Sequence, residues 1–213
     1  MKVLNLYAGI GGNRKLWTGV DVTAVELNPD IASIYQDFFP DDEVIVADAH
    51  QFLEDNYKDY DFIWTSPPCP THSRMRRWLT MQKPATKAVF PDMKLYEEIL
   101  FLSSYFEGKY CVENVASWYD PLIKPQEIGR HYYWANFKID KFKPKHKRVH
   151  RDRTWQDLQE IYGFDISEYN VKNKRKILRN CVEPEVGGLI LECALRESES
   201  GIKQTKMTVG VEE

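Results

Sequence analysis

The chain has 213 residues, of which 43% are hydrophobic, 13% aromatic and 29% charged, and its formal net charge is −3. This length fits one domain, and a large apolar fraction with charges of both signs excludes a disordered polyelectrolyte. No apolar run approaches the roughly 20 residues that cross a bilayer, and glycines end the apolar N-terminal stretch too early for a signal peptide. We therefore expect a globular protein of the cytoplasm with no membrane partner.

Strands and helices alternate along the first part of the chain. Short apolar runs over residues 3–7, 22–26, 44–47 and 62–65 predict strands, and residues 28–39 have helical spacing with Pro29 in the first turn. Residues 93–106 predict an amphipathic helix, residues 110–112 and 132–137 later strands, and residues 183–195 a helix opened by Pro184. This order predicts an α/β fold, doubly wound, with a mostly parallel sheet and helices on both faces.

A glycine-rich turn follows the first predicted strand and contains Gly9, Gly11 and Gly12. At this position an open parallel sheet binds the charged part of a nucleotide-like cofactor. Glu26 and Asp48 end the next two strands, where they could accept hydrogen bonds from an adenosine, or merely cap helices. Because the turn lacks a Lys or Arg and no phosphate-binding loop motif is present, we expect S-adenosylmethionine rather than ATP or NAD.

The fourth predicted strand ends in the sequence SPPCP, which places Cys69 at the same edge of the sheet. Three cations follow it, Arg74, Arg76 and Arg77, and we expect them to favour its thiolate and hence a nucleophilic role. Glu113 follows the fifth strand and is a candidate general acid.

The other three cysteines lie in apolar patterns and are expected in the core: Cys111, Cys181 and Cys193. No C-x-x-C pair is present, so no metal site is expected.

The order of these residues resembles the DNA (cytosine-5) methyltransferase family. The family's first motif, F-x-G-x-G, is similar to the stretch from Tyr7 to Gly11, with Tyr in place of Phe. Its catalytic P-P-C motif matches Pro68 and Cys69, and its E-N-V motif begins at Glu113. The resemblance assigns the ribose and adenine contacts to Glu26 and Asp48, and its last motif, at Asn180 and Val182, implies a return of the chain beside the cofactor.

Two motifs depart from the family pattern. The usual P-C-Q-P-F-S has lost its Gln and Phe here but keeps Ser73. The family's Q-x-R-x-R falls at residues 128–132 and retains Arg130, which the resemblance implies as the contact to the cytosine oxygen. A shift of one residue would make His131 the match, and a surface arginine is the plain alternative for Arg130.

The resemblance implies methyl transfer from S-adenosylmethionine to carbon 5 of a cytosine rotated out of double-stranded DNA. Cys69, Glu113 and Arg130 would be the catalytic residues. RNA is an alternative substrate, because relatives in the family modify transfer RNA. Two further alternatives are a methyltransferase of the exocyclic amine, since SPPC is similar to its S-P-P-[YWF] motif, and a non-catalytic or split-enzyme partner that binds DNA and cofactor.

Residues 1–196 are expected to form the catalytic domain, and residues 197–213 a polar tail. Only 42 residues separate Phe137 from Asn180, where the family has a much larger target-recognition domain, so this chain resembles a short form. Residues 138–153 carry a local charge of +6, and residues 172–179 add five more cations; both runs are either solvated loops or phosphate contacts. The expected contacts to DNA are Ser73, Arg74, Arg76, Arg77, Lys143, Lys145, Lys147 and Arg148.

Residues 138–179 are therefore expected to form a reduced basic DNA-contact segment. So small a segment predicts a short or relaxed recognition sequence, or a protein partner that supplies recognition. A restriction-modification setting in a prokaryotic or phage-infected cell is the corresponding expectation.

Overall fold

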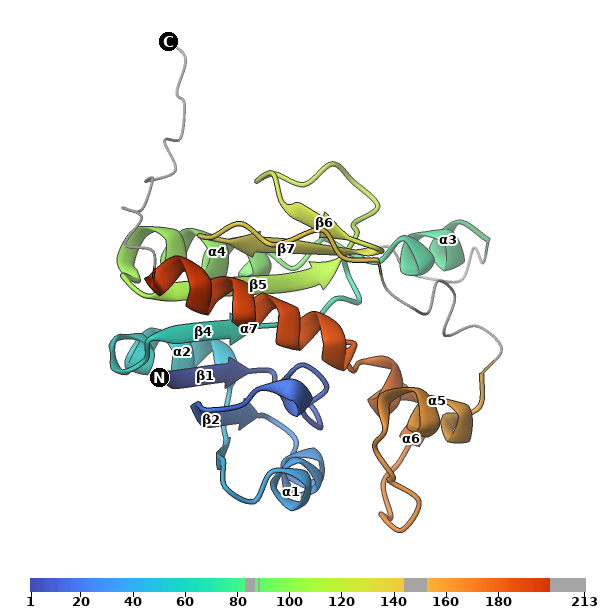
Figure 1. Cartoon of the computed structure of the whole chain (residues 1–213). Helices are drawn as coiled ribbons and strands as arrows, with labels where there is room; N and C mark the ends of the chain where they lie inside the picture. The colour runs from blue at the N-terminus through green and yellow to red at the C-terminus, as the bar shows by residue number, and fades with distance from the viewer. Residues whose placement is uncertain (83–86, 88, 144–152, 200–213) are drawn as a thin grey trace.

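The computed structural model describes residues 1–82, 87, 89–143 and 153–199, which contain one seven-stranded sheet with the strand order β3-β2-β1-β4-β5-β7-β6 (Figure 1). β1 to β5 run parallel, whereas β7 runs antiparallel to both β5 and β6. The strands are β1 (Lys2–Leu6), β2 (Asp21–Glu26), β3 (Glu43–Val46), β4 (Phe62–Thr65), β5 (Lys109–Val115), β6 (Gln126–Ile128) and β7 (His131–Ala135). The predicted doubly wound, mostly parallel α/β fold is confirmed.

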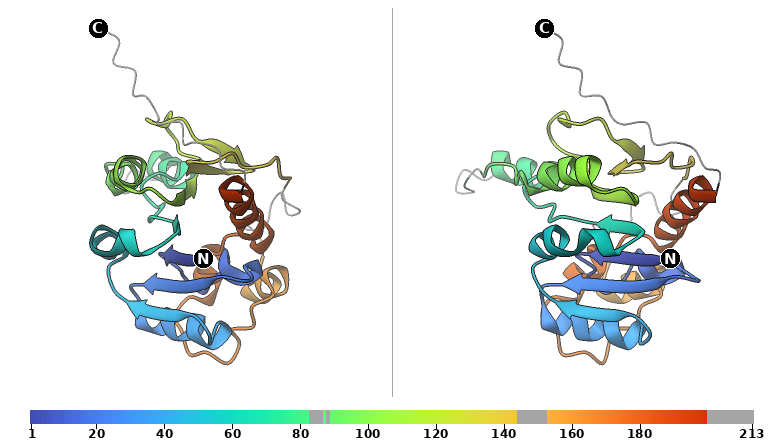
Figure 2. Two further views of the ribbon diagram at one scale, coloured as in Figure 1. Left: turned by 60° about the vertical axis from the view of Figure 1, so that its left-hand side comes forward. Right: turned by 90° about the vertical axis from the view of Figure 1, so that its left-hand side faces the viewer.

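Alternating side chains of the strands bury both faces of the sheet. Val3 of β1 packs in a cluster with α7 (Pro184–Glu199), and α1 (Pro29–Phe38) lies on the same face. Leu4 and Leu6 point the other way, toward α2 (Ala49–Asn56) and α4 (Lys94–Tyr105). A period of two residues along each strand therefore builds two apolar layers, one on each side of the sheet. Figure 2 shows these helices on both faces.

Among the described residues, four α-helices lie outside the predicted set: α2, α3 (Arg74–Gln82), α5 (Trp155–Tyr162) and α6 (Lys174–Arg179). A capping box between Thr154 and Asp157 starts α5, and left-handed Gly163 ends it. The segment of α5 and α6 has an apolar side, because Leu158 and Leu178 pack in one cluster with Ile10 and Ile34. Part of the expected contact segment is thus attached to the glycine turn and to α1.

The predicted cysteine environments hold for two of the three structural cysteines. Cys111 and Cys193 are buried, whereas Cys181 is only partly buried. α7 continues to Glu199, beyond its predicted end, and most of the predicted tail lies outside the described residues. Within the described ranges no helix is long and apolar enough to span a membrane.

Candidate active site

The glycine turn after β1 adopts a left-handed backbone conformation that favours glycine. Tyr7, Gly9 and Gly11 have φ angles of 55°, 56° and 85°, in the left-handed region. A Cβ atom on Gly11 would lie 2.2 Å from the ring of Phe39, so this position needs glycine. A Cβ on Gly9 would meet nothing within 4 Å, so the turn is open on that side. This opening at the carboxyl edge of the sheet fits a bound cofactor.

Both acids assigned to the cofactor also hold local structure. Glu26 accepts hydrogen bonds from the backbone N–H groups of Gly9 and Asn28, each at 3.0 Å, and so joins the glycine turn to the start of α1. Asp48 caps α2 by accepting bonds from the N–H groups of His50 and Gln51 through Oδ1. The capping interpretation is therefore observed for Asp48. The cofactor-binding role of both acids stays a prediction that their place beside the open turn fits.

The C-terminal part of the chain returns to the glycine turn. Asn180 ends α6, and a Cβ on Gly12 would lie 2.6 Å from the carbonyl oxygen of Val182. A Cβ on Gly187 would lie 2.1 Å from the carbonyl oxygen of Asn13, so α7 touches the turn closely as well. This arrangement agrees with the position that the resemblance implies for Asn180 and Val182.

The loop that carries the candidate nucleophile, residues 66–73, is called here the Cys69 loop. The carbonyl oxygen of Cys69 accepts hydrogen bonds from the N–H groups of His72 at 3.0 Å and Ser73 at 3.1 Å. Asn114, next to Glu113, donates from Nδ2 to the carbonyl oxygen of Pro67 at 2.9 Å. Because β4 and β5 are parallel neighbours, these contacts keep Cys69 and Glu113 at one edge of the sheet. Pro68, which the resemblance assigns to the cofactor, is exposed in this loop.

The electrostatic surroundings of Cys69 differ from the prediction. Burial, followed by the negative charge of Glu113, raises the pKa of the half-buried Cys69 thiol. The cations that act in the opposite direction are Arg179 and Lys176 of α6. For Arg74 and Arg77 the expectation that they favour the thiolate is therefore wrong, because the thiol is desolvated and lies next to a carboxylate, and the described cations that lower its pKa belong to α6.

Glu113 is buried, and the side chain that approaches its carboxylate from β7 is that of His131. His131 Nε2 lies 3.8 Å from Glu113 Oε1. The register pairs Glu113 with Tyr133 and Val115 with His131, so Glu113 and His131 share one face of the sheet. Arg130 is exposed in the turn between β6 and β7, and the structure does not bring it to Glu113.

A buried carboxylate beside the glycine turn was not predicted. Glu98 of α4 is 1% exposed and accepts hydrogen bonds from Tyr7 Oη at 2.6 Å and Thr65 Oγ1 at 2.5 Å. His50 Nδ1 lies 3.1 Å from Glu98 Oε1, and this hydrogen bond raises the pKa of His50. Glu98 thus connects the glycine turn, β4 and α2 (residues 49–56) beneath the expected cofactor site.

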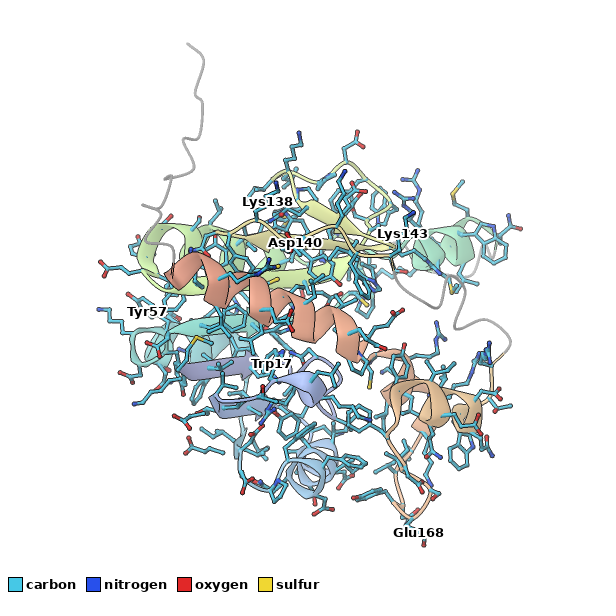
Figure 3. The ribbon with its side chains drawn as sticks, in the orientation of Figure 1. Trp17, Tyr57, Lys138, Asp140, Lys143 and Glu168 are labelled. Carbon is cyan, nitrogen blue, oxygen red and sulfur yellow. The ribbon has the colours of Figure 1, made fainter. Side chains whose placement is uncertain are left out.

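Of the predicted contacts to nucleic acid, Ser73 ends the Cys69 loop, where it forms an isolated bridge with Ser117, and the others divide into three groups. Arg74 Nε donates to the carbonyl oxygen of Ser117 at 2.8 Å, and the Arg77 guanidinium lies 4.5 Å from the ring centroid of Trp118. Lys143 is exposed at the end of the described part of the basic run (Figure 3). The side chain of Arg76, and the residues Lys145, Lys147 and Arg148, lie outside the described part of the chain.

Comparisons with known proteins identify a family model that matches the N-terminal part of the chain. Residues 1–99 match the family model of C-5 cytosine-specific DNA methylases. A tRNA (cytosine(38)-C(5))-methyltransferase from Spodoptera frugiperda is 33% identical over 94 residues, which are 41% of this chain and 28% of that protein. The chain therefore spans well under half the length of this relative.

Among solved structures, the Entamoeba histolytica methyltransferase EhMeth is similar in fold, with a TM-score of 0.55 at 13% identity, covering 93% of this chain and 98% of that one. A mutant of Spodoptera frugiperda DNMT2 aligns with a TM-score of 0.38 at 24% identity, over 54% of this chain and 35% of that one.

Proposed function

We propose that this chain, whose residues 1–99 match the family model of C-5 cytosine-specific DNA methylases, transfers a methyl group to carbon 5 of a cytosine in DNA. The observation that carries the proposal is the shared edge of Cys69 and Glu113, held by the bond from Asn114 to Pro67 next to an open glycine turn. A nucleophile and an acid side by side are what carbon 5 of cytosine requires, because this carbon is unreactive until a nucleophile adds to the ring.

The glycine turn, Glu26 and Asp48 would hold S-adenosylmethionine, together with the backbone of Val182. When bound, this group supplies the methyl that carbon 5 takes. The two carboxylates can accept hydrogen bonds from the hydroxyl and amine groups of an adenosine. The open side of Gly9 leaves room for the ligand to lie close to the backbone.

The thiolate of Cys69 would form a bond to carbon 6, and the electron pair of the 5,6 double bond would move to carbon 5. Glu113 would hold a proton at ring nitrogen 3, which stabilises the adduct. After methylation, loss of the proton from carbon 5 reforms the double bond as the bond from carbon 6 to sulfur breaks. The target base must leave the helical stack to reach this edge.

Replacement of Cys69 by Ala tests the proposal. The variant should bind S-adenosylmethionine with unchanged affinity in calorimetry and transfer no tritiated methyl to mixed DNA. Turnover in Cys69→Ala would refute the adduct. If the product is N4-methylcytosine after nuclease digestion, the exocyclic-amine alternative holds. If the wild-type chain binds DNA and cofactor without turnover, the non-catalytic or split-enzyme alternative holds.

RNA is the second candidate substrate. The relative that is 33% identical over 94 residues is named as a tRNA methyltransferase, and the expected recognition segment of this chain is short. The same assay with total transfer RNA in place of DNA separates the two substrates.

A further inference from the structure

A groove of about 310 Å³ lies beside the Cys69 loop, between α3 and the segment that follows β5. Its walls combine flat rings with charged groups: Arg74, Arg77, Trp78, Trp118, Tyr119 and Asp120. Neither Cys69 nor Glu113 belongs to these walls. The groove is therefore adjacent to, and separate from, the place where the proposed nucleophile and acid meet.

Backbone and side-chain contacts attach the groove firmly to the Cys69 loop. The Trp118 N–H donates to the carbonyl oxygen of His72, and Trp118 Nε1 donates to that of Thr71, both at 3.1 Å. Ser73 and Ser117 form an isolated antiparallel bridge. A ligand in the groove would thus keep a fixed position relative to Cys69.

The walls have the chemistry that stacks nucleobases. The Arg77 guanidinium already lies over the ring of Trp118, whose plane is at 86° to that of Tyr119. Trp78 is 50% exposed, although tryptophan is normally well buried. Unpaired bases stack on such rings and on arginine planes, and their edges bond to polar side chains. Asp120 provides an acceptor for a base amine, and within the described residues the Arg77 guanidinium has no hydrogen bond or ion pair.

We infer that this groove binds an unpaired nucleobase adjacent to the target cytosine, so that the substrate is single-stranded around the methylated base. The inference rests on the proposed function, because that function places the target at Cys69. In an intact duplex the neighbouring bases stay stacked on each other and cannot offer their faces to the groove. An unpaired DNA strand and an RNA loop present the same faces, so the experiment separates these two sources.

Binding of short fluorescent oligonucleotides tests the inference without any methyl transfer. One sequence with a central cytosine is prepared as single-stranded DNA, single-stranded RNA and duplex DNA, and anisotropy is measured at fixed salt. The Arg77→Ala and Trp78→Ala variants should each bind the preferred unpaired strand about fivefold or more weakly, the lower limit for loss of one stacking contact, with little change for the duplex. Whichever unpaired strand loses affinity in these variants, DNA or RNA, is the nucleic acid that the groove binds.

Lys58→Ala is the matched control. Lys58 also lies over a ring, 5.5 Å from the centroid of Tyr57, but it comes just before the amino end of β4 (residues 62–65), on the opposite edge of the sheet. This variant should bind all three oligonucleotides like the wild type. Equal losses on duplex and unpaired strands, or no loss from either groove variant, would overturn the inference.

Photochemical cross-linking locates the bound base directly. Oligonucleotides with a single 5-iodouracil next to the cytosine are irradiated with the protein, and the modified peptide is identified by mass spectrometry. Cross-links should fall on Trp78, Trp118 or Tyr119, and cross-links only elsewhere would contradict the groove. Cross-links in the groove without methyl transfer would refute the proposed function and support the base-binding groove. Methyl transfer without cross-links in the groove would support the proposed function and refute the base-binding groove.

Discussion

Opposing charges act on the thiol of Cys69. Burial and the carboxylate of Glu113 raise its pKa, while Arg179 and Lys176 lower it. The balance is a raised pKa, so at neutral pH the resting thiol is protonated more completely than an ordinary cysteine. A nucleophile in this state needs either alkaline conditions or a bound ligand that displaces water and changes the surrounding charge.

Alkylation by iodoacetamide should therefore show a high apparent pKa at Cys69. The rate should keep rising beyond pH 8.5, the region where a free thiol titrates. Glu113→Gln removes the carboxylate charge and should make alkylation at pH 8 faster, while it slows methyl transfer by about 10²- to 10⁴-fold as expected for loss of a general acid. Peptide mass spectrometry follows the reaction, with buried Cys111 as the unreactive internal control. Slower alkylation of Glu113→Gln would contradict this account.

The sequence alone could not decide whether Arg130 or His131 faces Glu113. Successive residues of a strand point to opposite faces, so a register error of one moves a side chain to the other face of the sheet. The motif alone allowed both alignments, and only the pairing of β5 with β7 shows that His131 shares a face with Glu113.

The burial of Glu98, by contrast, could have been predicted from the sequence. It lies on the same helical face as Leu95, Ile99 and Leu102, which are all buried. An acid within an apolar stripe indicates a buried carboxylate with partners, but those partners come from distant elements and could not be named.

Close contact between α7 and the glycine turn sets a steric limit at one residue of this helix. Gly187→Ala would place a methyl group 2.1 Å from a backbone oxygen of Asn13, and backbone cannot move aside as a side chain can. We expect a loss of about 1–3 kcal/mol in the free energy of unfolding, the usual cost of overpacking. Urea unfolding followed by circular dichroism measures it.

Gly188 provides the matched control in the same helix. Its added Cβ would lie 3.3 Å from the Cβ of Leu16, a tight contact that a shift of a few tenths of an ångström would relieve, and Leu16 is 51% exposed. Gly188→Ala should leave stability unchanged or raise it by up to about 1 kcal/mol, because alanine favours helix more than glycine does. Equal effects at both glycines would contradict the close approach of α7.

Elements with a strong apolar pattern could be predicted from the sequence, and the others could not. β4 has its predicted bounds, because all four residues from Phe62 to Thr65 are buried. α3 was not predicted, because most of its residues are polar and its large apolar side chains are exposed, two of them, Trp78 and Met81, lining the groove. β6 has three residues, too few for a periodic pattern, and owes its existence to pairing with β7.

For the molecule as a whole, the net charge of −3 conceals cations at the carboxyl edge of the sheet: Lys176 and Arg179 act on Cys69, and Lys143 lies on the same side of the molecule (Figure 3). Affinity for nucleic acid should fall steeply with salt, with a logarithmic slope of about −0.7 to −0.9 for each phosphate neutralised. Neutralising Lys143, Lys176 and Arg179 together should flatten this slope by about two units. Anisotropy titrations over a salt series measure the slope.

Lys2 and Lys58 at the opposite edge serve as the control pair. Their replacement by alanine should leave the salt dependence unchanged. A slope that is flat in the wild type, or that both sets of substitutions reduce equally, would show that Lys143, Lys176 and Arg179 do not bind phosphates.

The packing of residues 181–194 onto the first strand has a consequence for synthesis of the protein. Val3, Trp17 and Phe62 share one buried cluster with Val186, Ile190 and Cys193, so nearly the whole chain must leave the ribosome before this layer can close. Until then, the strands that bear the cofactor turn expose an apolar face. A nascent chain arrested before residue 184 should consequently bind holding chaperones and be degraded, even though every predicted catalytic residue has already been translated.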